Sequence, residues 1–229
     1  MLGVLGGMGP LATADFMAKV AAATPAARDQ EHIPVVAWSV PQIPERIPAI
    51  LGNGPSPLPA MLAGVRALRS VGAEAVAIAC NTAHYWYDDL INEGGVPILH
   101  IADAALAEAC RRAPGGRRIG LLATSGTIAA GFYQSRFRRE GYETLLPDST
   151  DQDLLHQAIY AVKSNDLATA ARLAEPVARD LLEAGADVIV AGCTELPLVL
   201  TGIDVQLRPR IVDATAALAA ACVAWSRGL

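Results

Sequence analysis

The sequence lacks the features that identify several common classes of protein. Its four cysteines form no CxxC pair, which disfavours a zinc ribbon and a thioredoxin-type site. Its four histidines are scattered, without HxH or HxxxH spacing, so we expect no metal site. Basic residues are outnumbered by acidic ones, 18 to 23, and the net charge of −5 argues against nucleic acid as a partner.

Long hydrophobic runs are also missing, although 52% of the residues are hydrophobic. The uncharged C-terminal run, residues 214–226, is too short to span a bilayer. The N-terminus lacks the basic region of a signal peptide. We therefore expect no membrane partner and a location in the cytoplasm, where thiols stay reduced. A chain of 229 residues is long enough for one large domain or two small ones with a sizeable core.

Two stretches of the sequence share one layout. Gly72 opens a run of small apolar residues that ends eight positions later at Cys80, and Gly185 opens a similar run that ends at Cys193. The repetition extends to whole halves of about 100 residues, in which strands alternate with helices. This pattern predicts an α/β fold of two similar Rossmann-like domains with parallel sheets, related by a pseudo-twofold, with the active site in the cleft between them. We place the first lobe at 1–102 plus 211–229 and the second at 103–210.

Local patterns predict the individual elements. The glycine loop 6–10 follows a short strand, but its spacing is not GxGxxG and it lacks the Lys-Ser/Thr pair of a phosphate-binding P-loop. The proline-rich segment 41–48 is expected to break both helix and sheet. Asp103 is expected to cap a helix. Other predicted elements are strands at 34–39 and 96–101 and helices at 11–23, 58–71, 128–140, 150–163 and 167–184.

The four cysteines divide into two groups. Cys110 and Cys222 lie inside alanine-rich helical stretches and are expected to be small buried hydrophobic side chains. Cys80 and Cys193 each end a predicted strand and precede polar residues. A helix that starts after each of them would favour the thiolate, which is the reactive form of cysteine.

Two opposed cysteines suit a particular kind of chemistry. A disulfide is disfavoured in the cytoplasm, and a Cys80–His84 pair has no counterpart beside Cys193. Two-base proton transfer uses both thiols: a thiolate removes a proton from one face of a carbon, and a thiol returns one to the other face. One thiolate and one thiol also avoid two like charges at close range. The developing enediolate would be stabilised by backbone N–H groups and by the side chains of Asn81, Thr82 and Thr194.

Four motifs in order resemble the cofactor-independent aspartate racemases of the aspartate/glutamate racemase superfamily. They are Leu5-Gly6-Gly7-Met8-Gly9-Pro10, Pro41-Gln42-Ile43-Pro44-Glu45-Arg46, Cys80-Asn81-Thr82-Ala83-His84 and Gly192-Cys193-Thr194-Glu195. The resemblance covers nearly the whole chain. It implies two α/β domains with the active site between them, no cofactor such as pyridoxal phosphate, and a homodimer.

The resemblance also implies roles for individual residues. Cys80 and Cys193 would be the acid/base pair of L-/D-aspartate racemisation. The α-carboxylate and amino group would be bound by Asn81, Thr82 and Thr194. The side-chain carboxylate would be held by Arg46 and Lys163, although sequence pattern alone favours a solvated Arg46. Met8 and Thr124 would line the pocket from equivalent loops.

Some positions bear on the substrate. Glu195 stands where glutamate racemases carry histidine, which favours the aspartate type, and Cys80 stands where broad-specificity Asp/Glu relatives carry threonine, which favours a two-cysteine racemase. Val40 and Glu45, close to Arg46, depart from the expected polar residue and aspartate. The alternatives are racemisation of glutamate or a related acid, cis–trans isomerisation of a dicarboxylate such as maleate, and an amino-acid-binding paralogue without activity.

Overall fold

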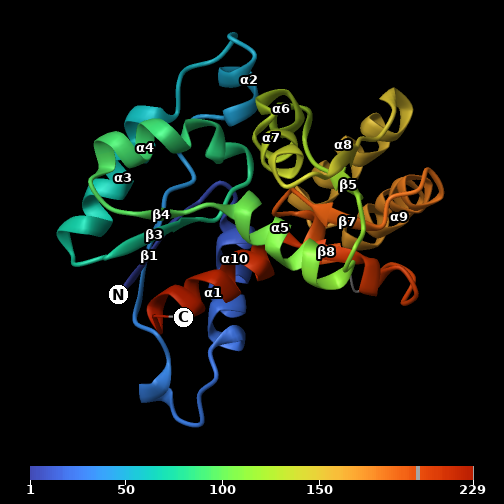
Figure 1. Ribbon diagram of the computed structural model, residues 1–229. Helices are drawn as coiled ribbons and strands as arrows, with labels where there is room; N and C mark the ends of the chain where they lie inside the picture. Colours follow the sequence, from blue (N-terminus) through green and yellow to red (C-terminus); the bar gives the residue numbers. More distant parts are fainter. Residues whose placement is uncertain (200–201, 229) are drawn as a thin grey trace. The chain divides into compact units, whose positions relative to one another are not determined.

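The computed structural model describes residues 1–199 and 202–228, which form two compact units (Figure 1). The first unit contains residues 1–101 and 215–229, and the second contains residues 102–214. Each unit is built around a four-stranded parallel sheet with helices between the strands. The predicted α/β class with two parallel-sheet domains is therefore confirmed.

The sheet of the first unit has the strand order β2-β1-β3-β4. Its central strands, β1 and β3, are runs of small and branched apolar residues that are buried along their whole length, as parallel strands covered on both faces are. The elements of this unit are β1 (Leu2–Gly6), α1 (Pro10–Ala23), η1 (Asp29–Glu31), β2 (Val35–Ser39), α2 (Arg46–Ile50), α3 (Leu58–Ser70), β3 (Ala75–Ile78), η2 (Thr82–Trp86), α4 (Tyr87–Gly94), β4 (Ile98–Leu99) and most of α10 (Ala214–Ser226).

The sheet of the second unit has the equivalent order β6-β5-β7-β8. Helices α8 and α9 lie side by side in this unit (Figure 1) and contribute much of its apolar core. The elements are α5 (Ile101–Arg112), β5 (Arg118–Leu122), α6 (Ser125–Ala130), α7 (Phe132–Arg139), β6 (Glu143–Leu145), α8 (Ser149–Lys163), α9 (Leu167–Glu183), β7 (Val188–Ala191), η3 (Leu196–Val199), η4 (Arg208–Arg210) and β8 (Ile211–Asp213).

The two sheets repeat one topology, as the duplicated sequence pattern predicted. In each sheet the first strand along the chain lies between the second and the third: Leu5 pairs with Ile78 in one sheet, and Leu122 pairs with Ala191 in the other. All these strands are parallel, so their carboxyl ends meet at one edge of each sheet, where ligands of open α/β sheets bind. The pseudo-twofold and the cleft between the lobes remain predictions.

The lobe boundaries differ from the expected ones at the second crossing of the chain. Strand β8 pairs with β7, from Ile189–Ile211 to Ala191–Asp213, so residues 211–214 belong to the second unit and not to the first. At the first crossing the unit ends at residue 101 where we expected 102. The helix expected to start at Asp103 begins two residues earlier, and Asp103 forms an ion pair with Arg136 at 2.7 Å instead of capping it.

Three predicted elements differ in extent. The proline-rich segment contains a short helix, α2, because Pro48 falls in its first turn, where no intrahelical N–H bond is lost. The helix expected at 128–140 is divided into α6 and α7 by Gly131, which has a φ of +68°. Strand β4 covers only two of the six residues expected. No helix in the described part of the chain is long and apolar enough to cross a membrane.

The loop after β1 depends on Gly7. Its φ of +90° is one that side chains with a Cβ rarely adopt, and a Cβ would lie 2.4 Å from the backbone of Val40. The Gly7 N–H also donates to Thr13 Oγ1 at 2.8 Å, which fixes the loop against α1.

Gly7→Ala is therefore expected to lower the free energy of unfolding by about 2–4 kcal/mol, from backbone strain plus displacement of the Val40 segment. Gly52→Ala is the matched control, because its φ is +77° but nothing lies within 4 Å of the added Cβ. Urea unfolding of both variants measures the difference. If Gly7→Ala and Gly52→Ala lowered the free energy of unfolding equally, the close approach of the added Cβ to Val40 would not contribute to the loss.

Candidate active site

The first half of the candidate site lies at the carboxyl edge of the first sheet. Cys80 follows β3, and Met8 follows the neighbouring strand β1. Both are 4% exposed and belong to one apolar cluster, together with Ile43 of the proline-rich segment. The thiol therefore lies in a largely apolar environment at the end of a buried strand. The structure places Met8 and Cys80 in the same corner of the first unit.

Arg46 is held beside Met8 by backbone carbonyl groups. Its guanidinium donates to the carbonyl oxygens of Met8 at 3.2 Å, Pro44 at 3.0 Å and, at 3.4 Å, Ile43. Its Nε–H is buried and has no hydrogen-bond partner among the described residues. No described carboxylate forms an ion pair with Arg46. A half-buried guanidinium fixed by neutral acceptors is suited to bind an anionic group from outside the chain.

His84 braces the turn that carries Cys80. Its Nδ1 lies 2.9 Å from the Cys80 carbonyl oxygen and 3.3 Å from that of Asn81, so Nδ1 carries the proton and donates it. Its Nε2 accepts the Ile101 N–H at 3.3 Å. The ring is therefore a neutral imidazole with both nitrogens engaged by backbone, and it acts on the Cys80 main chain. This arrangement excludes His84 in this state as the base that activates the thiol.

His84→Ala is expected to lower the free energy of unfolding by about 2–4 kcal/mol, because a buried ring is lost and the Ile101 N–H loses its acceptor. His32→Ala is a suitable control, since that histidine is exposed. Chemical denaturation of the two variants gives the comparison. If His84→Ala lowered the free energy of unfolding no more than His32→Ala does, the hydrogen bonds of His84 to the backbone would not contribute to stability.

The polar residues after Cys80 are buried in a 3-10 helix. Asn81 precedes and Thr82 opens η2, and both side chains are largely inaccessible. The helix expected after Cys80 begins as the 3-10 helix η2 and continues into α4, and the 3-10 helix η3 follows Cys193. The helical run that starts after Cys80 therefore extends from Thr82 to Gly94, whereas η3 after Cys193 has 4 residues. In both places the first backbone N–H groups of the helix lie closest to the thiol.

The second half of the candidate site lies at the carboxyl edge of the second sheet. Cys193 follows β7 and is 5% exposed. Thr124 follows the neighbouring strand β5 and caps α6, where its hydroxyl accepts the Thr127 N–H at 3.2 Å. Thr194 is buried directly after the cysteine. Thr124 and Cys193 therefore hold the positions in this unit that Met8 and Cys80 hold in the first.

Glu195 contacts the Cys193 thiol directly, a role that the sequence did not predict. Its Oε2 accepts the Cys193 S–H at 3.1 Å and the Thr194 hydroxyl at 3.0 Å. The side chain is only 7% exposed. The motif Gly-Cys-Thr-Glu could have indicated this contact. An acidic residue two positions after a cysteine can approach the thiol when the chain turns between them.

Lys163 is not brought to this edge within the second unit. It is the last residue of α8, its side chain is exposed, and its ammonium lies 5.4 Å from the centre of the Tyr160 ring. His156, seven residues earlier on α8, accepts the Ser125 N–H at 3.1 Å beside Thr124. Seven residues span about 10 Å of helix. Lys163 therefore lies well away from Thr124 along α8, and its role in substrate binding stays a prediction.

Of the two other cysteines, Cys222 is buried as expected, whereas Cys110 is only half-buried. Burial raises the pKa of the Cys222 thiol to about 12, so it stays protonated at neutral pH. Cys110 contacts Tyr142, whose pKa is raised first by its hydrogen bond to that thiol. No group of three or more His, Cys, Asp or Glu side chains among residues 1–199 and 202–228 is arranged to hold a metal ion.

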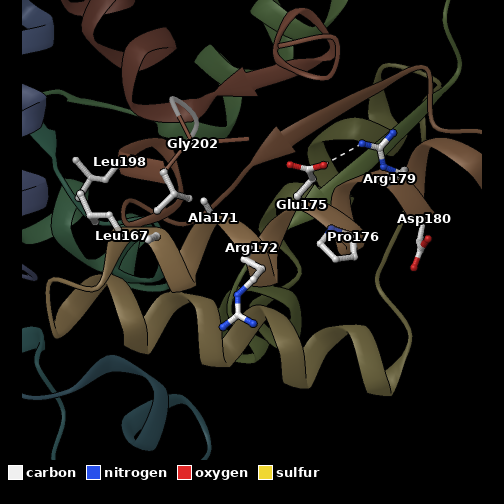
Figure 2. A pocket seen from close by; sticks show the side chains of 11 residues that line it. Leu167, Ala171, Arg172, Glu175, Pro176, Arg179, Asp180, Leu198 and Gly202 are labelled. Carbon is white, nitrogen blue, oxygen red and sulfur yellow. Dashed lines mark hydrogen bonds and ion pairs between the residues drawn. The ribbon is translucent and has the colours of Figure 1, made fainter. Parts of the chain in front are cut away.

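A groove of about 700 Å³ in the second unit runs along α9 (Figure 2). Its lining includes Leu167, Arg172, Leu198 and the ion pair of Arg179 with Glu175 at 2.9 Å. Arg179 also pairs with Asp204 at 3.3 Å, so its charge is balanced within the chain. Of the described residues that line the groove, none is a predicted site residue, so it is separate from the half-site at Cys193.

Comparisons with known proteins match nearly the whole chain. The family model described as Asp/Glu/Hydantoin racemase matches residues 5–222. The solved structure of aspartate racemase from Picrophilus torridus has a TM-score of 0.85 at 33% identity, covering 99% of this chain and 94% of that one. The broad specificity amino-acid racemase RacX of Bacillus subtilis is 28% identical over 97% of this chain and 96% of its own length. Glutamate racemase from Francisella tularensis shares the fold, with a TM-score of 0.66 at 14% identity over 99% of this chain and 81% of that one.

The family model covers far more than half of the chain, and the structural match to the Picrophilus protein extends over both units. Cys80 and Cys193 follow the equivalent strands β3 and β7 of the two sheets. The chain is therefore a member of the Asp/Glu/hydantoin racemase family of isomerases.

Proposed function

We propose that the protein interconverts L- and D-aspartate by proton transfer at Cα, with Cys80 and Cys193 as the acid/base pair and without pyridoxal phosphate. The observation that carries the proposal is the equivalence of the two cysteines, each buried directly after the third strand of its sheet. In the proposed enzyme the two thiols face each other across the substrate. We also propose that the protein acts in the cytoplasm, and that it is a homodimer, as the resemblance to aspartate racemases implies.

Each turnover moves one proton off Cα and another onto it. The thiolate of one cysteine takes the Cα proton and becomes a thiol, and the bond electrons remain on the substrate as an enediolate. The thiol of the other cysteine donates its proton to the opposite face of Cα and becomes a thiolate. The configuration at Cα is inverted, and the pair again holds one proton in total.

Stabilisation of the enediolate is the main electrostatic requirement of this mechanism. Asn81, Thr82 and Thr194 are buried beside the cysteines, and we assign their polar groups to the α-carboxylate and amino group. Met8 and Thr124 line the pocket. Because these contacts strengthen as negative charge develops, they lower the barrier more than they stabilise the bound amino acid.

The preference for aspartate is assigned to the far end of the substrate. Arg46 presents a guanidinium that no described carboxylate neutralises, and it lies beside Met8 at the same edge as Cys80. The side-chain carboxylate of the bound amino acid would form an ion pair with this guanidinium. Lys163 is the second candidate for this carboxylate.

A broader amino-acid specificity is the second candidate function. It is favoured by the match to a broad specificity racemase over 97% of the chain. The two candidates differ in how strongly the side-chain carboxylate is required.

Incubation in D2O distinguishes these functions. The purified protein is incubated without cofactor with single enantiomers of aspartate, glutamate and a neutral amino acid, and deuterium at Cα and optical rotation are followed. Exchange with inversion that is fastest for aspartate supports the proposal, whereas similar rates for all three indicate a broad racemase. Absence of exchange with any amino acid refutes both, and maleate is then the next substrate to test.

A further inference from the structure

The Glu195 carboxylate makes the two cysteines unequal. It touches the Cys193 thiol, and in the described residues of the first unit no hydrogen bond joins a carboxylate to Cys80. Two donors, the Cys193 S–H and the Thr194 hydroxyl, converge on one oxygen of Glu195. Convergence of two donors on one oxygen is the arrangement of an ionised carboxylate acting as acceptor.

The charge on Glu195 is not balanced by a basic side chain. Among the described residues no lysine, arginine or histidine forms an ion pair with it, although the side chain is 7% exposed. Its stabilisation comes from the two hydrogen bonds that it accepts. The loss of the Cys193 proton would remove one of these bonds and place a second negative charge about 3 Å from the first, in a site with little water to screen it.

Three other titratable groups of the second unit lie on α7 and α8. Tyr133 on α7 is fully buried, and its pKa is raised well above the usual value, first by burial and then by negative charge at Cys193 and Asp213. It therefore stays neutral at physiological pH. Arg136 is paired with Asp103 at 2.7 Å. On α8, His156 uses Nε2 as an acceptor beside Ser125 and Gln152, so that nitrogen carries no proton.

We propose that Glu195 is a positioning residue that keeps Cys193 protonated in the free enzyme, so that Cys80 is the thiolate base and Cys193 the acid of the predominant resting form. The inference rests on the proposed two-base function and adds an asymmetry to it. The predominant form accepts the enantiomer whose Cα proton faces Cys80. The opposite enantiomer requires the less populated form in which Cys193 has lost its proton.

Alkylation by iodoacetamide tests this assignment without any substrate, because only the thiolate reacts. Peptide mass spectrometry gives separate rates for the two cysteines between pH 5 and pH 10, a range chosen to bracket the ordinary thiol titration. In the unmodified protein, the midpoint for Cys193 is expected at higher pH than the midpoint for Cys80. A Cys193 midpoint at or below that of Cys80 overturns the proposal.

Variants of Glu195 give the second measurement. Glu195→Gln keeps an acceptor for Thr194 and removes the charge, so alkylation of Cys193 at pH 7 should accelerate about tenfold for a shift of one pH unit. Glu195→Asp keeps the charge and should stay much closer to the unmodified protein. Glu183→Gln removes an exposed carboxylate of the same unit and should change nothing. The Cys80 rate in each sample is the internal reference.

Two results with the Glu195 variants would overturn the proposal that its charge keeps Cys193 protonated. An unchanged or slower Cys193 rate in Glu195→Gln overturns the proposal, as does an equal acceleration in Glu195→Asp, because charge would not be the cause. Cys222 is fully buried and reports unfolding. If Cys222 becomes reactive in a variant, the pH midpoints of the unmodified protein decide alone. Racemisation enters none of these rates, so a failure of the proposed function is recognised separately in the D2O experiment.

Discussion

Replacing either Cys80 or Cys193 by alanine is expected to abolish racemisation, with a fall in kcat of about a thousandfold or more, because each thiol handles the proton on one face of Cα. Both side chains lie at strand ends, where substitution by alanine leaves the sheet pairing intact. The loss should therefore appear in the rate and not in the folding of the chain. Optical rotation with enantiopure aspartate measures the rate.

The single variants are expected to keep a partial reaction that a general loss of structure would remove. With Cys193 replaced, Cys80 still takes the proton from the enantiomer that faces it and returns a solvent deuteron to the same face. With Cys80 replaced, Cys193 does so for the opposite enantiomer. Deuterium at Cα without inversion, with complementary enantiomer preferences in the two variants, is the expected signature. The double variant should exchange neither enantiomer.

Cys110→Ala and Cys222→Ala are the matched controls for these substitutions. Cys110 lies near the end of α5 and contacts Tyr142, and Cys222 is fully buried with its pKa raised to about 12, so neither follows a strand as Cys80 and Cys193 do. Both controls should racemise at the rate of the unmodified protein. Racemisation that survives in Cys80→Ala or Cys193→Ala would exclude the two-base mechanism.

The sequence predicted the parts of the fold that depend on long buried runs. The stretches before Cys80 and Cys193 are apolar on both faces, which only a central parallel strand requires, and the strand ends then follow from the register. The repeat of one strand order in both units could be predicted for the same reason. The placement of Met8 and Thr124 beside the cysteines follows from strand adjacency.

Features that depend on tertiary pairing or on side-chain conformation could not be predicted in this way. Strand β8 is assigned to the second unit by its hydrogen bonds to β7, which its short sequence does not encode. The bond from Cys193 to Glu195 depends on a turn that brings positions i and i+2 together. His84 faces back to the Cys80 carbonyl, a side-chain conformation that the sequence pattern does not specify.

Arg46→Ala is expected to raise the KM for aspartate about a hundredfold, which corresponds to about 3 kcal/mol for a buried charge left without its partner. The reason is the unpaired Nε–H and the absence of a carboxylate partner among the described residues, which leave the guanidinium available to the substrate. The effect on kcat should be smaller, because the side-chain carboxylate carries little new charge in the transition state. Initial rates over a range of aspartate concentrations separate the two constants.

Arg46 also ties Met8 to the proline-rich segment, so its substrate role must be separated from this structural one. Arg46→Lys keeps the charge but loses the planar fork, and its KM should fall between that of the unmodified protein and that of Arg46→Ala. Arg66→Ala removes an exposed arginine that pairs with Glu93 at 3.6 Å, and should leave both constants unchanged. If Arg46 acted only by holding Met8 against the proline-rich segment, Arg46→Ala would lower kcat and thermal stability together. An unchanged KM in a stably folded Arg46→Ala would assign the side-chain carboxylate to another residue, and Lys163 would be the next to replace.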